Sequence, residues 1–400
     1  MKRISIIISM MAYSLFIFLF FPNFVQANEP LQQDKAEMDQ QYIHEQVENI
    51  GLEDITSFWD YIMKEYGGYL PESQKGSLYQ FIEGEKRFSI QEWFQGMVKF
   101  LFYEILANGK LLGTLILLTI FSTLLQHLQT AFEQNTVSKI AYAIVYMVLI
   151  IIALNSFHVA ISYTEEAISR MTSFLLALLP LLLALMASSG GVLSAAFFHP
   201  VIIFLMNTSG LLIEKIVLPL LFLSALLYLV STLSEQFKVT QLAQLLRNIG
   251  IGLLGAFLTI FLGVLSVQGA SAAVSDGITL RTAKFVTGNF VPVLGKMFTD
   301  AADTVISASM LLKNTVGLIG AAILLIIALF PAIKVLALSF IYKFAAALLQ
   351  PLGGGPVINC LDIISKSVIY IFAALAIVSV MFFLSITVII AAGNLTMMVR

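Results

Sequence analysis

Long apolar stretches dominate the chain beyond its first quarter and restrict it to one class of fold. A helix needs about 20 apolar residues to cross a bilayer. The chain is 59% hydrophobic with a mean hydropathy of +0.92, whereas soluble domains are roughly 45–50% apolar. We therefore expect an all-α, polytopic helical membrane protein with about seven or eight spans. The expected spans are Leu111–Leu128, Ile140–Ala160, Val192–Ile213, Ile216–Leu233, Ile249–Val267, Val316–Leu338, Ser367–Ala392 and the shorter Phe174–Ser188, which contains Pro180.

A secretory-type signal precedes these stretches. The chain begins with the basic segment Met1–Arg3, continues with the apolar run Ile4–Phe21, and has small residues before position 28 at the positions that signal peptidase reads. We expect residues 1–27 to be a cleavable signal peptide that is cut between Ala27 and Asn28. The alternative is an uncleaved anchor helix, because the apolar run is close to the lower length limit for a span.

Residues 28–105 differ in composition and are expected to form a small extracytoplasmic helical domain. The segment is acidic and aromatic, and its apolar residues recur at helical spacing until Gly67-Gly68. Ser89 and Glu92 form a capping-box pattern that predicts a second helix start. Cys360 is the one cysteine of the chain, so no internal disulfide can staple this small segment. We expect it to dock on a partner or on the multi-span domain, residues 106–400.

Export of that domain sets the expected orientation of the spans. The first span then runs inward. If Phe174–Ser188 also spans, residues 235–247 lie in the cytoplasm and residues 268–315 lie outside. Basic residues divide between the two sides under this topology, so the positive-inside rule alone does not decide it.

An internal repeat links residues 174–270 to residues 285–393. In this alignment Pro180 corresponds to Pro292 and Gly210 corresponds to Gly317. Either the halves arose by duplication, or they match by chance because apolar sequences resemble one another. Repeated halves with segments interrupted by proline and glycine are typical of transporters.

No motif in the sequence predicts catalysis, a cofactor or a metal site. Glu165, Glu166 and Arg170 spell the Glu-Glu-x-x-x-Arg pattern of intramembrane metalloproteases, but none of the four histidines has the spacing that this class requires. No His-Glu-x-x-His, Gly-x-Ser-x-Gly or P-loop pattern occurs either. The net charge of -2 gives no sign of nucleic-acid binding.

A few polar positions within the apolar region are candidate structural or pore positions. Glu214 and Lys215 form either a tight interfacial turn, which we favour, or a pair buried between spans. Gly353 belongs to a break that is either a re-entrant loop or a plain turn. Asp362 either faces a polar cavity or is an ordinary interfacial carboxylate.

The last span carries a family resemblance. Residues 381–387 (Met-Phe-Phe-Leu-Ser-Ile-Thr) and 391–394 (Ala-Ala-Gly-Asn) resemble the C-terminus of the stage III sporulation protein AE family of endospore-forming bacteria. The signal peptide, the exported segment, residues 178–180, residues 267–285 and residues 350–353 also resemble that family. Residues 354–356 (Gly-Gly-Pro) depart from it, which weakens any specific role for that loop.

The resemblance implies a sporulation-specific, multi-pass protein of the mother-cell membrane around the forespore. Such a protein is a non-enzymatic component of a secretion-like channel complex that supports late forespore gene expression and forespore maintenance. The implied partners are a secretion-type ATPase, small membrane proteins, ring proteins of the intermembrane space, membrane lipid and, as an open alternative, a membrane insertase. The repeat instead favours a self-contained secondary transporter for a small solute.

Overall fold

The computed structural model describes residues 53–71, 75–82, 89–131, 136–233, 238–290, 294–352 and 355–398. All of them belong to one compact unit, Gln46–Arg400. The elements in these ranges are helices and their connections, without strands, which confirms the expected all-α class. The predicted cleavage site between Ala27 and Asn28 lies outside the described residues, so cleavage stays a prediction.

In the part of the chain that the structure describes, three helices precede the first long apolar helix. They are α3 (Glu53–Tyr66), α4 (Leu78–Ile82) and α5 (Ile90–Ala107). In α3, the buried residues recur at spacings of three and four, as one face of an amphipathic helix requires; they are Ile55, Trp59, Ile62 and Tyr66. The capping box expected at the start of α5 is not formed, because Ser89 is at the N-cap but makes no side-chain capping hydrogen bond.

The remaining helices are long and largely apolar. They are α6 (Gly109–Ala131), α7 (Thr136–Ser188), α8 (Val192–Leu212), η2 (Ile213–Val217), α9 (Leu218–Leu233), α10 (Thr240–Phe290), α11 (Leu294–Leu349) and α12 (Pro356–Met398), with the short η3 (Gln350–Leu352) before α12. The apolar part of α7 alone has 49 residues, which at 1.5 Å per residue gives about 70 Å. That length exceeds the ~30 Å hydrocarbon core of a bilayer.

Within the described residues, 6 helical stretches are long and apolar enough to cross a membrane, so the expected seven or eight separate spans merge into fewer. The stretches Ile140–Ala160 and Phe174–Ser188 are parts of α7. The charged residues between them do not end the helix, because Arg170 donates to Glu166 one turn away, at 2.7 Å. Pro180 is exposed inside α7, where the helix continues through it.

The turn that we favoured at Glu214 and Lys215 is wrong. Both residues belong to η2, a π-helical segment that joins α8 to α9 into one continuous apolar stretch, Val192–Thr232. Glu214 is half-buried and Lys215 is exposed. A π-helical turn widens the helix locally, so it can present a charged pair at the surface without a break in the chain direction.

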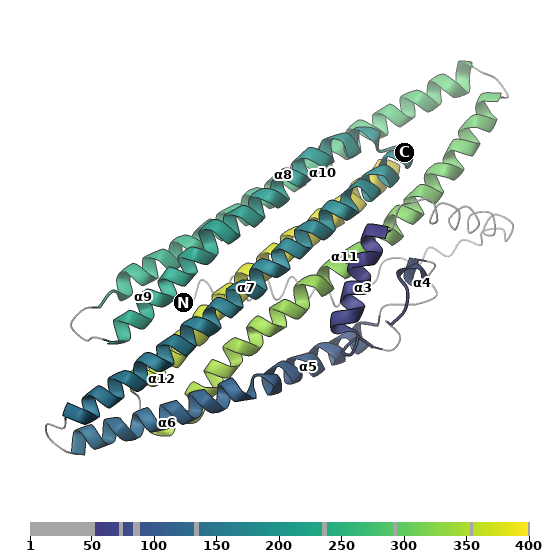
Figure 1. Cartoon of the computed structure of the whole chain (residues 1–400). Coiled ribbons are helices and arrows are strands. Elements are labelled where there is room, and N and C mark those ends of the chain that lie inside the picture. The colour runs from purple at the N-terminus through teal and green to yellow at the C-terminus, as the bar shows by residue number, and fades with distance from the viewer. Residues whose placement is uncertain are drawn as a thin grey trace. The chain divides into compact units, whose positions relative to one another are not determined.

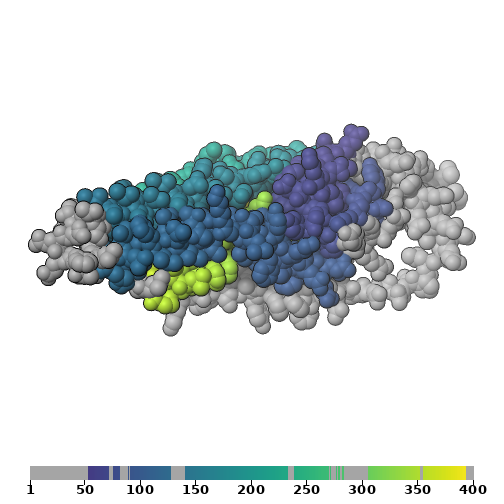
Figure 2. Space-filling view, turned by 60° about the horizontal axis from the view of Figure 1, so that its bottom comes forward, coloured from purple at the N-terminus to yellow at the C-terminus, as the bar shows by residue number. Residues whose placement is uncertain are grey.

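The long helices pack side by side, and α11 lies between the pair α7 and α12 and the N-terminal helices α3 and α5 (Figure 1). It contacts α12, α7, α10, α6, α5 and α3. In its most apolar window, 72% of the residues are buried, the largest share of any candidate span. Figure 2 shows α3 in purple beside α5 and α6 in blue on one face of the molecule. The N-terminal helices are therefore joined to the most buried helix of the bundle.

The tight turn between α7 and α8 depends on glycine and on a distant carboxylate. Gly190 has a φ of +92°, which side chains other than glycine rarely adopt. Asp276, on α10, is buried and accepts from the backbone amides of Leu193 at 3.1 Å and Ser194 at 3.2 Å. It caps the N-terminus of α8 in place of Gly191, which has no side chain to do so.

We expect Asp276→Ala to loosen the first turn of α8. Loss of an N-cap acceptor costs about 0.5–2 kcal/mol, so the amides of Leu193 and Ser194 should exchange with deuterium faster than in the unmodified protein. The control is Asp276→Asn, which keeps one side-chain acceptor and should retain more protection. Unchanged exchange in the alanine variant would show that Asp276 is not the cap.

Candidate functional site

An aromatic cluster attaches the N-terminal helices to the long-helix bundle. Tyr66 on α3 stacks on Phe330 of α11 with ring centroids 4.0 Å apart, and Phe100 of α5 meets Phe330 edge-on at 4.8 Å. Phe100 also meets Tyr66 edge-on at 5.9 Å. Phe330 is 1% exposed. Edge-on and offset ring pairs add to the burial of apolar surface, so this cluster is the hydrophobic centre of the attachment.

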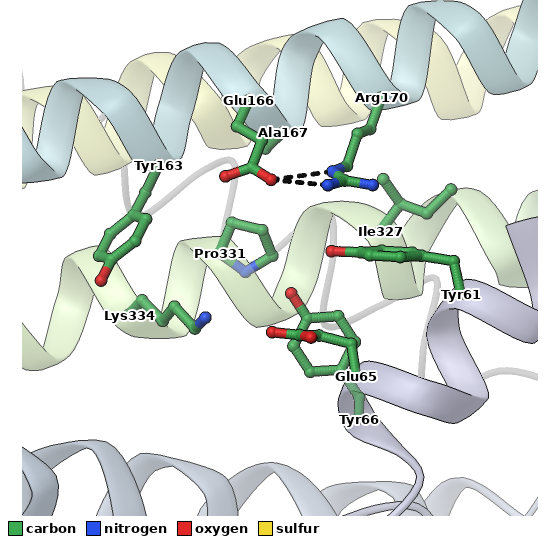
Figure 3. Close-up of a pocket in the computed structure, with 10 residues that line it drawn as sticks. All are labelled: Tyr61, Glu65, Tyr66, Tyr163, Glu166, Ala167, Arg170, Ile327, Pro331 and Lys334. Atoms are coloured by element: carbon green, nitrogen blue, oxygen red, sulfur yellow. Dashed lines mark hydrogen bonds and ion pairs between the residues drawn. The ribbon is translucent and has the colours of Figure 1, made fainter.

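A small cavity of about 50 Å³ lies beside the aromatic cluster, between α3, α7 and α11 (Figure 3). We call its lining the junction; the lining residues are Tyr61, Glu65, Tyr66, Tyr163, Glu166, Ala167, Arg170, Ile327, Pro331 and Lys334. A buried water needs only about 10–15 Å³ of such space together with polar partners. The cavity therefore has room for a few waters and not for a solute molecule.

Cations from the long helices face tyrosine rings of the junction. The Arg170 guanidinium, held by Glu166, lies 4.0 Å from the centroid of the Tyr61 ring. On the other side, the Lys334 ammonium lies 5.3 Å from the ring of Tyr163 and 5.8 Å from that of Tyr66. Each contact of this kind contributes about 0.5–2 kcal/mol, depending on its desolvation. Two cations thus help to hold α3 against α7 and α11.

Partial burial changes the acid–base behaviour of two groups near the junction. Burial raises the pKa of the Tyr66 hydroxyl, which keeps it neutral. Burial also raises the pKa of the Glu104 carboxyl, and the charge of Lys334 and a hydrogen bond from Asn108 oppose that rise. The ionised form of Glu104 therefore has a desolvation cost, which the positive charge of Lys334 offsets in part.

We expect Glu104→Gln to remove a pH dependence of the free energy of unfolding. The pKa of Glu104 is raised in the folded state, so the folded protein binds more protons than the unfolded chain, and stability falls as pH rises through that range. The glutamine variant should lose this decline and unfold at a higher temperature than the parent at neutral pH. Thermal unfolding at mildly acidic and neutral pH, with exposed Asp60→Asn as the control, measures the difference. Parallel pH curves for parent and variant would contradict the assignment.

Two candidate pore positions, Gly317 and Gly210, lie at helix–helix contacts away from the junction, and no contact between the two is recorded. A Cβ on Gly317 of α11 would lie 2.5 Å from Ile390 Cδ1 of α12 and 3.7 Å from Leu182 Cδ2 of α7. Gly210 faces α7 less closely, with Ile168 Cγ2 3.9 Å from a Cβ at that position. Gly317 is therefore a close-packing position between helices. Pro292 and Gly353 lie outside the described residues.

Asp362 is an ion-paired carboxylate on α12. Its Oδ1 lies 2.5 Å from Lys343 Nζ of α11, and its Oδ2 lies 2.5 Å from Lys366 Nζ one turn further along α12. The two ammonium groups offset the desolvation cost of the Asp362 carboxylate, so the carboxylate is stable at a partly buried position. Within the described residues, no ion pair or hydrogen bond is recorded between Asp362 and Glu214 or Lys215.

Other charged residues inside apolar helices were not predicted as site residues. They include Asp276, Lys313, Lys334 and Arg247. The ammonium of the buried Lys313 side chain donates to the Ile390 carbonyl at 3.1 Å. The one signal that marks them in the sequence is a charge within an apolar helix, which is costly and for that reason informative. Their partners lie far away along the chain, so no spacing rule identifies them.

Fold and junction together define a multi-pass, all-α membrane protein with its helices α3 and α5 packed on α11, which carries the most buried candidate span. Residues 73–393 match the family model described as stage III sporulation protein AE. A curated relative, stage III sporulation protein AE of Bacillus subtilis (strain 168), is 72% identical over 373 residues, which cover 93% of this chain and 94% of the relative. The chain belongs to the stage III sporulation protein AE family, as the resemblance of its last span predicted, and its role is in sporulation. No solved structure matches the chain.

Proposed function

We propose that this protein is a non-enzymatic membrane component of a secretion-like channel complex that links mother cell and forespore. In this role it supports late forespore gene expression and forespore maintenance. The observation that carries the proposal is the junction, which joins an acidic, aromatic segment to the most buried helix of the bundle. A partner bound to that segment would be coupled to the membrane helices through ring stacking and cation contacts.

Helix continuity favours this function over a self-contained transporter. Secondary transporters typically expose backbone groups to their substrate at broken helices near the middle of the membrane. Here α7 continues through Pro180, α11 continues through Pro331, and η2 keeps the chain helical between α8 and α9. Within the described residues, these positions therefore supply no interrupted helix at which a solute could bind.

Charge distribution supports an extracytoplasmic position for the N-terminal segment. The Tyr146 hydroxyl lies within hydrogen-bonding distance of Thr232 and of the Pro356 carbonyl, which groups the start of α7, the end of α9 and the start of α12 at one end. Lys343 and Lys366 lie near that end, and a cytoplasmic position for it agrees with the positive-inside rule. α6 leads from α5 to the same end, where Gln126 approaches Gly355. On this topology, we propose that α5 begins on the opposite side, in the intermembrane space.

The outer face of α5 is the surface that we propose meets the partners. Phe94 is 63% exposed, Phe102 is 61% exposed and Leu106 is 78% exposed. Exposed apolar side chains grouped on one helix are typical of interaction sites. The proposed partners are the secretion-type ATPase, small membrane proteins and intermembrane ring proteins of the complex, together with membrane lipid; the ring proteins are the ones within reach of α5 on this topology.

The test replaces exposed aromatic residues and follows the complex in sporulating cells. Phe94→Ser/Phe102→Ser should insert into the membrane normally, but should no longer co-purify the ring proteins and should reduce a late forespore reporter. The matched control is Phe204→Ser on α8, because Phe204 is 67% exposed in a different part of the bundle. Unchanged co-purification by the double variant would refute the surface. Solute uptake by the purified protein in liposomes would favour the transporter instead.

A further inference from the structure

A second cavity, of about 180 Å³, lies between α9, α10 and α12, apart from the junction. Its lining combines apolar, hydroxyl and basic side chains; the residues are Leu221, Ser224, Tyr228, Arg247, Ile363, Lys366, Ser367 and Tyr370. The lining contains two cations and no carboxylate. Its volume is sufficient for a small hydrated anion, in contrast to the few waters that the junction can hold.

Among the described residues, Arg247 contacts aromatic rings in this cavity, and no ion pair with an acid is recorded for it. Its guanidinium lies 5.6 Å from the ring centroid of Tyr228 on α9 and 5.3 Å from that of Tyr370 on α12. Its Nε is buried and has no hydrogen-bond partner within the described part of the chain. A buried charged donor that lacks an acceptor carries a desolvation penalty. The two rings therefore fix the orientation of the guanidinium but leave its buried Nε without an acceptor among the described residues.

The charges around the cavity sum to an excess of positive charge. Lys366 lines the cavity and shares Asp362 with Lys343. One carboxylate between two ammonium groups leaves one positive charge over, and Arg247 adds a second. The hydroxyls of Ser224 and Ser367 already donate to the carbonyls of Ala243 and Ile363. Arg247 and Lys366 are therefore the charged donors that this lining offers to a ligand.

We propose that this cavity binds a phosphate-bearing anion. A planar guanidinium can donate two parallel hydrogen bonds to phosphate oxygens, and a neighbouring ammonium adds a point charge. Basic pockets between membrane helices are suited to anionic lipid headgroups. Arg247 is about two turns from the start of α10 at Thr240, which is a depth that a headgroup can reach. The same chemistry also accepts free phosphate, so the experiment must separate the two sources.

The test uses the full chain, purified in detergent. Native mass spectrometry compares retention of phosphatidylglycerol with retention of phosphatidylcholine, and titration calorimetry measures binding of inorganic phosphate. We expect phosphatidylglycerol to be preferred by about five- to tenfold, and Arg247→Gln or Lys366→Gln to remove the preference. The control is Lys215→Gln, an exposed cation in η2, which should leave it intact. Arg247→Lys keeps the charge but loses the planar fork, so it should bind more weakly than the parent.

The outcomes separate cleanly, with circular dichroism used to confirm that each variant is folded. Selective retention of phosphatidylglycerol that depends on Arg247 assigns the cavity to a lipid headgroup. Arg247-dependent binding of inorganic phosphate without lipid selectivity assigns it to free phosphate. Equal binding by the parent and a folded Arg247→Gln variant, or no binding of either probe, would overturn the proposal. If Arg247→Gln does not fold, the comparison of Lys366→Gln with Lys215→Gln decides.

Discussion

Replacing Phe330 by alanine should release α3 and α5 from α11 before the long helices unfold. Phe330 is 1% exposed and touches the rings of both Tyr66 and Phe100. Loss of a buried phenylalanine side chain costs about 3–5 kcal/mol in a close-packed site. Because Phe330 provides the α11 side of the aromatic cluster, we expect the loss to appear first in the N-terminal helices.

Tryptophan fluorescence reports on those helices selectively. The two tryptophans of the chain, Trp59 and Trp93, lie in α3 and α5. In Phe330→Ala, the thermal midpoint from tryptophan emission should fall well below the midpoint from far-ultraviolet circular dichroism, which is dominated by the long helices. Phe204→Ala is the control, because Phe204 is 67% exposed and its removal leaves no internal cavity. A tryptophan midpoint equal to that of the parent would show that the cluster does not hold the segment.

Replacing Gly317 by alanine should destabilise the packing of α11 on α12. The added methyl group would lie 2.5 Å from both Cγ1 and Cδ1 of Ile390, which is closer than real Cβ contacts allow. Ile390 is β-branched and has restricted rotamers in a helix, so the helices must move apart. Overpacking of this kind costs about 1–3 kcal/mol, and we expect a lower midpoint by circular dichroism.

Gly255→Ala is the matched control for that change. Gly255 also lies inside a long helix, α10, but no atom lies within 4 Å of a Cβ at that position. Alanine favours a helix over glycine by about 1 kcal/mol, so this control should be neutral or slightly stabilising. The two substitutions should thus differ in sign. Stabilisation by both substitutions would indicate that backbone propensity, and not helix spacing, determines the effect.

The class of fold could be predicted from the sequence because hydrophobicity is a property of each segment alone. A stretch of apolar residues must leave water wherever it lies, so the presence of membrane helices did not depend on their neighbours. The number of separate spans did depend on context. Glu166 and Arg170 interrupt the apolar pattern, yet they pair within one turn of α7 and the helix continues. Glu214 and Lys215 were misassigned to a turn because they also interrupt an apolar pattern, although the π-helical segment η2 keeps the chain helical there.

The candidate site was predicted less completely. Lys366 is one turn from Asp362 and could be paired with it from spacing alone, whereas Lys343 reaches the same carboxylate from another helix. Neither Tyr66 nor Phe330 carries a signal in the sequence beyond being aromatic. Such contacts depend on the relative rotation and height of packed helices, which the pattern within one helix does not specify.

The sequence by itself determined that this protein is a multi-pass, all-α membrane protein of the stage III sporulation protein AE family. Those properties follow from local hydrophobicity and from motifs that are continuous in the chain. Only the tertiary structure decided that α3 and α5 are held on α11, that Asp276 caps α8, and that Arg247 lies between two tyrosine rings. Each of these contacts joins residues on different helices. Their energies arise from packing and desolvation at that contact, which exist only after the helices have assembled.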